Sequence, residues 1–358
     1  MVSKRYYKKN AWWVSPFNEV PEVAKQILPS GRVELHDITL RDWGRSYGVV
    51  YSASETRRIT EMLIEIGIER IEIGLPDSSG PDQEAVKKIC ESSSDTDIYT
   101  YIRNSKKEID QAAACGMDGV VISVPIGYPR LRHQLNWTWE NALEKSVDFI
   151  SHAKSQQLKT IFAPYDATRA RPEDLENLLK GIAKSAEPDE LCVEDTTGCA
   201  LPQTLQYLVK KSKQLLRGVP VQVHTHNDFG LAVSGALSAA AAGAQVLCTC
   251  TNGLGSRLGS APLEEVVLCL KILLGLGNEY NMEKLLELCL LVEELSGIPI
   301  GANKPFGGYR SYISDDAGFE SATSHPLIRF ATDPRYFGRN VQMVPEPKDE
   351  EKRSKLRR

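Results

Sequence analysis

Long apolar segments are missing from this chain. No uninterrupted apolar run reaches the roughly 20 residues that a membrane-spanning helix needs. The first residues, MVSKRYYKKNAWWV, are basic but lack the apolar core of a signal peptide. These two absences predict a protein that works in the cytoplasm, and we expect no membrane partner.

An excess of charge of one sign is also missing. The 358 residues include 43 lysines and arginines against 47 aspartates and glutamates, which gives a formal net charge of −4. A protein that binds nucleic acid or an anionic membrane through its overall field needs a positive excess. We therefore expect no nucleic-acid partner. The hydrophobic fraction of 42% is that of an ordinary globular protein.

Cysteine pairs of the CxxC type are absent as well. The eight cysteines lie in apolar runs such as ELCVED, VLCTC and LELCLL, which predicts reduced thiols packed in the core. Cys248 and Cys250 would share one face of a strand, so a thiolate metal site is the alternative. No second pair completes such a site, and we favour packing.

No predicted strand is followed by a GxGxxG turn, which leaves an open doubly wound sheet as the second choice of fold. The chain instead alternates eight short β-rich runs with amphipathic helical stretches. Eight βα units over about 250 residues predict an α/β fold of the (β/α)8 TIM-barrel type. The predicted strands are 33–40, 70–76, 97–103, 119–125, 159–167, 190–198, 219–228 and 245–253.

The segments outside the barrel are short. We divide the chain into an N-terminal extension (1–31), the barrel (32–278), a post-barrel subdomain (279–345) and a charged tail (346–358). The post-barrel part starts with a predicted helix, NMEKLLELCLLVEELSG, and continues as an irregular appendage too short for a core of its own. We expect this appendage to cover a barrel mouth, its own or a partner's, and the tail to be disordered.

The stretch VHTHNDFG (223–230) is the strongest functional signal. Side chains alternate along a strand, so His224, His226 and Asp228 are predicted to point to one face. In (β/α)8 barrels the chemistry lies at the C-terminal ends of the strands. Two neutral imidazoles and a carboxylate from across the barrel form an open site for a divalent cation, and Asp42 is the best third ligand. Two satisfied core histidines are the alternative.

Further polar residues lie at the predicted strand ends. Arg41 offers a fixed cation for a developing enolate or alkoxide, although Arg41 and Glu72 could equally form a structural ion pair. The loop NGLGSRLGS after the eighth strand either binds a phosphate or carboxylate through its amides or is only a connector. The other polar residues at strand ends are Arg103, Asp166, Arg169, Glu194, Asp195 and Thr196.

Together these stretches resemble the DRE-TIM metallolyases, which include isopropylmalate, homocitrate and citramalate synthases and hydroxymethylglutaryl-CoA lyase. The likeness spans about residues 33 to 345, and its post-barrel part is more similar to the synthases. The matching stretches are DITLRD (37–42), IEIGLP (71–76), DATR (166–169), DTTG (195–198), HTHNDFGLAV (224–233) and NGLGSRLGSAPLEEV (252–266). The three letters of the name correspond to Asp42, Arg41 and Glu72.

The resemblance implies a divalent cation (Mg, Mn, Zn or Co) held by Asp42, His224 and His226. Ser260 stands where the family has an asparagine that contacts the metal. In the synthases, acetyl-CoA forms an enolate that attacks the carbonyl of a metal-chelated 2-oxo acid. The resemblance also implies a homodimer.

By the same resemblance, Arg41 would stabilise the enolate or the carbonyl, and Glu72 would orient the site. The strand 8 loop would border the CoA pocket. We assign the substrate contacts to Arg45, Arg103, Thr196 and Arg169.

Departures from the family pattern surround this core. Phe319 stands where the family has its acid/base histidine, and phenylalanine cannot take a proton. His325 and Tyr312 are candidates to take over the role of that histidine. Arg257 lies near the place of the lyase's cysteine. The other departures are Trp43 for glycine, Arg45 for glutamine, Tyr165 for glutamate, Ser256 for glutamate and Ser260 for asparagine.

Three functions follow. The first is a metal-dependent acyltransferase that condenses acetyl-CoA with a 2-oxo acid, for which Arg45 and Arg103 suit an additional acidic group. The second is a retro-aldol or retro-Claisen lyase on the same scaffold. The third is a barrel that binds metal without catalysis, and the intact metal core argues against it.

Overall fold

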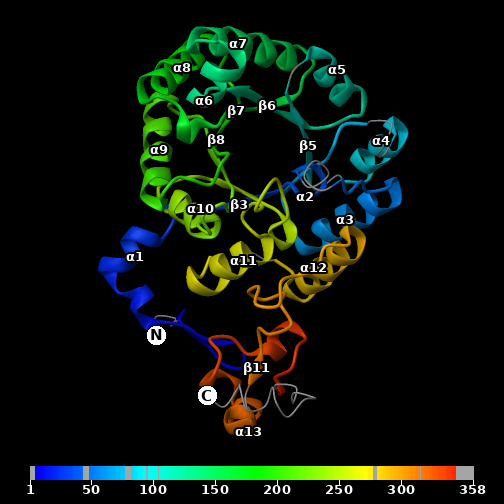
Figure 1. The fold of residues 1–358 in the computed structure, drawn as a ribbon, viewed down its shortest axis with the longest axis vertical. Coiled ribbons are helices and arrows are strands. Elements are labelled where there is room, and N and C mark those ends of the chain that lie inside the picture. Colours follow the sequence, from blue (N-terminus) through cyan, green and yellow to red (C-terminus); the bar gives the residue numbers. More distant parts are fainter. Residues whose placement is uncertain are drawn as a thin grey trace.

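The described part of the chain forms a closed barrel of eight parallel strands surrounded by helices (Figure 1). The strands follow chain order around the barrel, from β3 to β10, and β10 closes it by pairing with β3. The predicted (β/α)8 barrel is therefore confirmed. The computed structural model describes residues 5–42, 48–76, 82–93, 96–103, 105–276, 280–314 and 316–343.

Seven of the eight barrel strands are shorter than predicted, and β6 has the predicted bounds. The first ends at Asp37, because its carboxylate accepts the backbone N–H of Thr39 at 3.0 Å and turns the chain. The seventh ends at Thr225 instead of continuing to Asp228. The barrel strands are β3 Glu34–Asp37, β4 Arg70–Glu72, β5 Asp97–Ile102, β6 Gly119–Pro125, β7 Lys159–Tyr165, β8 Glu190–Asp195, β9 Val221–Thr225 and β10 Val246–Thr249.

The helices between the strands bury one apolar face on the barrel, and α3 shows how the sequence specifies this. Ser52 and Glu55 form a capping box at its start, and Gly67, with a left-handed backbone, ends it. Between them Ile59 and Leu63, four residues apart, are buried. The barrel helices are α3 Ala53–Ile66, α4 Gln83–Ser92, α5 Lys106–Ala114, α7 Trp139–Ser155, α8 Pro172–Ser185, α9 Pro202–Leu215, α10 Ala232–Ala241 and α11 Leu263–Leu268. The shorter helices are α1 Pro21–Ile27, α2 Thr39–Asp42 and α6 Tyr128–Arg130.

Two apolar layers form the core. The larger one lies between strands and helices, and the smaller one fills the barrel interior with residues that include Tyr101, Cys248 and Cys250. These two cysteines pack as predicted. Cys199 is exposed, so the prediction of core thiols was wrong for this residue, which lies in the turn after β8.

The N-terminal and post-barrel segments fold together. The backbone N–H of Trp13 donates to Ala331 at 2.9 Å, and that of Asp333 donates to Ala11 at 2.7 Å. Its elements are β1 Tyr7–Lys8, β2 Trp12–Trp13, β11 Ile313–Ser314, α13 Asp316–Ser324 and β12 Gln342–Met343, and α12 Met282–Ser296 connects it to the barrel. In Figure 1 this unit lies beside the barrel, past α11 and α12, and not across the ring of strands, so the appendage does not cover the mouth of its own barrel.

Some predictions fall on other parts of the chain. Trp43, Arg45 and the tail 346–358 lie outside the described residues, so what was predicted for them stays a prediction. Within the described ranges, no helix has both the length and the apolar character needed to cross a membrane.

Candidate active site

A helical turn and a strand end position the central residues of the site. Arg41 and Asp42 lie on α2, a single helical turn directly after β3, where the predicted strand continued to residue 40. His224 lies on β9. His226 follows the strand and forms an isolated β-bridge with Ser260, which keeps the chain extended there. Because the chain stays extended, both imidazoles point the same way.

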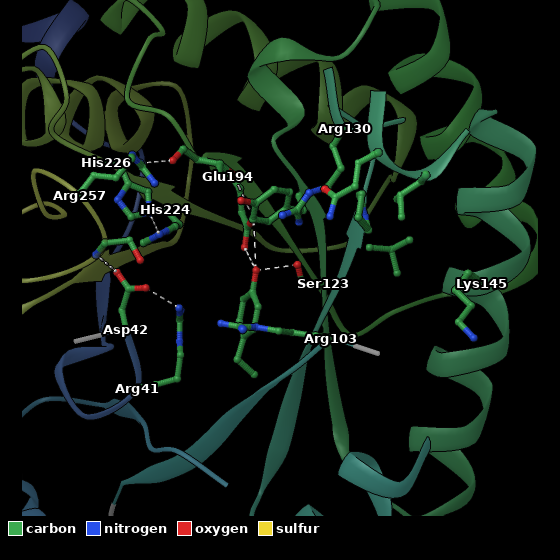
Figure 2. Close-up of a pocket in the computed structure, with 18 of the residues that line it drawn as sticks. Arg41, Asp42, Arg103, Ser123, Arg130, Lys145, Glu194, His224, His226 and Arg257 are labelled. Atoms are coloured by element: carbon green, nitrogen blue, oxygen red, sulfur yellow. Dashed lines mark hydrogen bonds and ion pairs between the residues drawn. The ribbon is translucent and has the colours of Figure 1, made fainter. Parts of the chain in front are cut away.

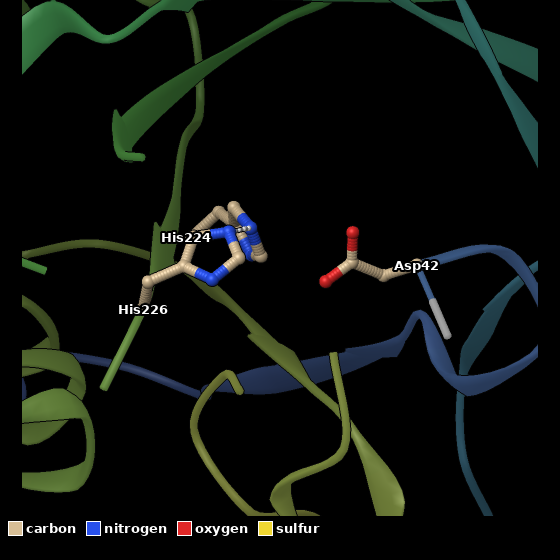
Figure 3. A group of neighbouring side chains, drawn as sticks. All are labelled: Asp42, His224 and His226. Atoms are coloured by element: carbon tan, nitrogen blue, oxygen red, sulfur yellow. Dashed lines mark hydrogen bonds between the residues drawn. The ribbon is translucent and has the colours of Figure 1, made fainter. Parts of the chain in front are cut away.

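Asp42, His224 and His226 form one buried group at the barrel mouth (Figure 3). One ligand atom from each lies within 4.8 Å of those of the other two, and the two imidazole Nε2 atoms are 3.0 Å apart. Two nitrogens bound about 2.1 Å from one cation at a right angle are about 3 Å apart. The spacing therefore fits two neighbouring ligands of a single divalent cation.

Hydrogen bonds determine which imidazole nitrogens are available. Nδ1 of His226 lies 3.1 Å from the carbonyl oxygen of Gly259, which can only accept a hydrogen, so the lone pair of neutral His226 is on Nε2. Nε2 of His224 faces that lone pair. Nδ1 of His224 has no hydrogen-bond partner among the described residues. A cation held by both histidines would bind the lone pair on each Nε2, with the proton of each imidazole on Nδ1.

The protonation states also suit a cation. Burial lowers the pKa of His224 well below its ordinary value, and His226 beside it lowers it further. Burial likewise lowers the pKa of His226. For Asp42, burial favours the neutral acid, but Arg41 and the two histidines outweigh it and lower the pKa to about 2. Neutral imidazoles and an ionised carboxylate are the forms that bind metal.

Arg41 is held from three sides. Its Nη1 donates to the carboxylate of Asp42 at 2.9 Å, its Nε donates to Glu72, and its guanidinium carbon lies 4.3 Å from the ring centroid of Tyr101. Glu72 is buried and is not among the residues that line the cavity. It thus contacts the site through Arg41, which fits the orienting role implied for it.

The loop after β10 wraps closely around Asp42. The backbone N–H of Ser256 donates to Asp42 Oδ2 at 3.3 Å, and Ser260 Oγ donates to the same oxygen at 3.4 Å. Gly255 has φ +150°, and a Cβ placed there would lie 2.7 Å from that oxygen. Glycine is therefore required for the loop to approach the carboxylate. The hydroxyl of Ser260 therefore lies next to the predicted metal position, in contact with Asp42 Oδ2.

A cavity of about 520 Å³ opens in front of this group (Figure 2). Asp42 and Glu194 are the only carboxylates among the described residues that line it. Its lining also includes Arg41, Tyr101, Arg103, Ser123, Arg130, Gln134, Trp137, Lys145, Tyr165, Thr196, His224, His226, Ser256 and Arg257. The cationic groups outnumber the acidic ones, so the cavity suits an anionic ligand.

Glu194 lies on β8 and is almost completely buried. Its Oε1 is hydrogen-bonded to the hydroxyl of Tyr101 at 3.1 Å, and that hydroxyl is also bonded to Ser123 Oγ at 2.6 Å. Burial raises the pKa of Glu194 to about 8, although Arg41 and the Tyr101 hydrogen bond act in the opposite direction. A carboxyl with a pKa near the working pH is suited to proton transfer.

The structure separates the predicted substrate contacts. Arg103 and Thr196 line the cavity. Arg169 does not, because its guanidinium binds the buried carboxylate of Asp166 with a shortest distance of 2.7 Å. Asp228 does not share the face of the histidines, since the strand has ended before it, and its carboxylate binds Arg257 at 2.9 Å.

The residues considered for the missing acid/base histidine lie elsewhere. Phe319 is on α13 in the appendage. Tyr312 is hydrogen-bonded to Thr332 at 2.9 Å, and His325 lines a separate groove of about 1260 Å³ beside the N-terminal hairpin. Neither replaces the histidine within this chain, because neither lines the cavity.

Several cavity residues were not predicted from the sequence. Tyr101 had a usable signal, because it precedes Arg103 by two positions and period-two alternation places both on one face. Arg130 lies on the short helix α6, which follows β6, and Lys145 lies on α7. No periodicity of loops or helices indicates which residues reach the mouth of a barrel.

Comparisons with known proteins agree with this geometry. The family model described as HMGL-like matches residues 32–292. The homocitrate synthase AksA of Methanopyrus kandleri is 33% identical over 331 residues, which are 92% of this chain and 82% of that protein. A probable 2-isopropylmalate synthase of Ignicoccus hospitalis is 32% identical over 87% of this chain and 78% of its own length.

Solved structures share the fold. The hydroxymethylglutaryl-CoA lyase of Pseudomonas aeruginosa superposes with a TM-score of 0.66 at 17% identity, over 77% of this chain and 96% of the lyase. The family match covers the whole barrel and the greater part of α12, and it includes every metal-binding candidate at the barrel mouth. The chain therefore belongs to the HMGL-like family, as the resemblance at its strand ends predicted.

Proposed function

We propose that the protein is a divalent-metal-dependent acyltransferase that joins the acetyl group of acetyl-CoA to the carbonyl carbon of a 2-oxo acid. The observation that carries the proposal is the buried group Asp42, His224 and His226, with Arg41 against the carboxylate. The names of relatives that are 32–33% identical to this chain, homocitrate synthase and 2-isopropylmalate synthase, support a condensing reaction over cleavage.

The cavity residues have distinct tasks in this reaction. A divalent cation on Asp42, His224 and His226 would supply Lewis-acid polarisation of the 2-oxo acid carbonyl. Arg41, fixed by its partners, places a permanent positive charge where the enolate or alkoxide oxygen develops. Arg103 lines the outer cavity and suits a further acidic group on the 2-oxo acid.

The Thr196 hydroxyl holds the backbone N–H of Asp166 at 2.9 Å and lies at the cavity wall, where it suits a contact to the 2-oxo acid. Arg257 occupies the region where the lyases have a cysteine, and its guanidinium is engaged by Asp228. No cysteine is among the cavity-lining residues in the described ranges. This observation favours the synthase reaction over the lyase reaction.

The test is release of free thiol from acetyl-CoA by the metal-loaded protein, across a panel of 2-oxo acids. Hydrolysis of the condensed thioester frees the thiol, so release should depend on both the metal and one class of acceptor. A chelator-treated sample and a His224→Ala variant are the controls. A protein that releases no thiol with any acceptor, but cleaves a 3-hydroxyacyl-CoA, would be a lyase and would contradict the proposal.

A homodimer working in the cytoplasm belongs to the same proposal and rests on the resemblance and the composition. The appendage lies beside its own barrel, so it is placed to reach a second copy. Light scattering tests the dimer directly, and a monomeric mass at assay concentration would contradict it.

A further inference from the structure

The cavity contains one carboxyl group that the metal site does not use. Of the two that line it among the described residues, Asp42 belongs to the metal-binding group and Glu194 does not. Glu194 is near the C-terminal end of β8, beside β9, and Figure 2 shows it between the histidines and the outer cavity. A carboxyl group at this position can reach a ligand that contacts both the histidines and the outer cavity.

Glu194 is held in place by hydrogen bonds and not by an ion pair. Its partners are hydroxyl groups: Tyr101 at 3.1 Å on Oε1, and Thr196 at 3.5 Å on Oε2. Within the described ranges no lysine or arginine lies at ion-pair distance from it. Hydroxyl partners orient a carboxylate without occupying all of its lone pairs, so one remains for a proton from a ligand.

Two groups of the family pattern are missing from this chain. Tyr165 replaces a carboxylate on β7, and the guanidinium of Arg130 lies over its ring, 4.5 Å from the centroid. Phe319 replaces the histidine and lies in the appendage. Glu194, on the strand next to β7, brings a carboxyl to the same cavity from a neighbouring position.

We propose that Glu194 is the general base that removes a proton from the methyl group of acetyl-CoA, and that Tyr101 is the positioning residue that orients it. This inference rests on the proposed condensation. The methyl C–H bond breaks, and its electron pair forms the C=C bond of the enolate. The thioester oxygen takes the negative charge, and the proton goes to Glu194.

The second half of the cycle restores the base. The enolate carbon bonds to the carbonyl carbon of the 2-oxo acid, and the π electron pair of that carbonyl moves to its oxygen. The proton on Glu194 then passes to this alkoxide and gives the tertiary hydroxyl. The enolate oxygen re-forms the thioester carbonyl, and Glu194 is ionised again before the thioester is hydrolysed.

The experiment compares Glu194→Gln with the wild type under conditions that support thiol release. Glutamine keeps the shape and accepts the Tyr101 hydrogen bond but cannot take a proton. We expect kcat to fall about 10²–10⁴-fold with little change in KM for the 2-oxo acid. With trideuteromethyl acetyl-CoA, the isotope effect on kcat should rise in the variant, because proton abstraction then limits the rate. Metal affinity should remain that of the wild type.

The matched control is Glu144→Gln, an exposed glutamate on α7 outside the cavity lining, which should leave kcat and the isotope effect unchanged. If Glu194→Gln does not fold, Glu194→Asp carries the test, because a retracted carboxylate should lower kcat and raise the isotope effect. A Gln or Asp variant with wild-type kcat and isotope effect overturns the assignment but leaves the condensation standing. A wild type that releases no thiol with any 2-oxo acid overturns both.

Discussion

Gly255 lies where a Cβ would collide with the metal-binding carboxylate, so Gly255→Ala perturbs that carboxylate directly. The added Cβ would lie 2.7 Å from Asp42 Oδ2 and 3.0 Å from Ser260 Oγ, where ordinary contact begins at 3.4 Å. Asp42 must move by several tenths of an ångström or the loop must open. Disturbing the groups that orient a ligand typically lowers metal affinity about 10–100-fold, or about 1.4–2.7 kcal/mol. The unusual φ of +150° adds about 1–3 kcal/mol of backbone strain.

The assay is calorimetric titration of the metal-free protein with Mn²⁺ or Zn²⁺, together with thermal unfolding. Gly218→Ala is the matched control, because Gly218 also has a positive φ of +85° but nothing within 4 Å of the added Cβ. Both variants should lose stability, and only Gly255→Ala should lose metal affinity. Equal metal affinity in all three proteins would refute the contact argument and the position assigned to the cation.

Three further substitutions test other contacts. Arg41→Lys should lower kcat about 10²–10³-fold, because lysine cannot span Asp42 and Glu72 as the guanidinium does. A loss below tenfold in steady-state assays at saturating metal would contradict its role. Arg103→Gln should raise KM for a 2-oxo diacid about tenfold while leaving kcat near wild type. An unchanged KM would show that Arg103 does not contact the substrate. Lys304→Met should lower the free energy of unfolding by about 3 kcal/mol in urea titrations, because it removes the ammonium group 3.3 Å from the buried carboxylate of Glu264. A loss below about 1 kcal/mol would count against that ion pair.

The sequence predicted the fold well because the barrel depends on periodicity. The eight alternations of strand and helix come from local patterns of apolar residues that do not need distant contacts. Strand ends were less accurate, because the turn that stops β3 depends on one hydrogen bond from Thr39 to Asp37. The pairing of the N-terminal hairpin with residues 331–333 could not be predicted, since residues more than 300 positions apart form it.

The site residues were also predicted correctly in some cases and wrongly in others. Asp42, His224 and His226 were brought together because parallel strands deliver their C-terminal ends to one mouth. Asp228 was misplaced, because the extended chain ends after His226 and the carboxylate of Asp228 then pairs with Arg257. Glu194 was predicted only as a polar residue at a strand end and was given no role. Its proposed role depends on a hydrogen bond with the hydroxyl of Tyr101, which lies on β5, three strands away around the barrel.

The most direct test of the condensation follows both carbons of the acetyl group. The metal-loaded protein is incubated with acetyl-CoA labelled with ¹³C at both acetyl carbons and with the 2-oxo acid that supports thiol release, and products are separated by mass spectrometry. We predict a hydroxy acid two carbons longer than the acceptor that carries both labelled carbons and disappears with chelator. Labelled acetate alone, with no longer product, would mean that the protein only hydrolyses the thioester and would contradict the proposed reaction.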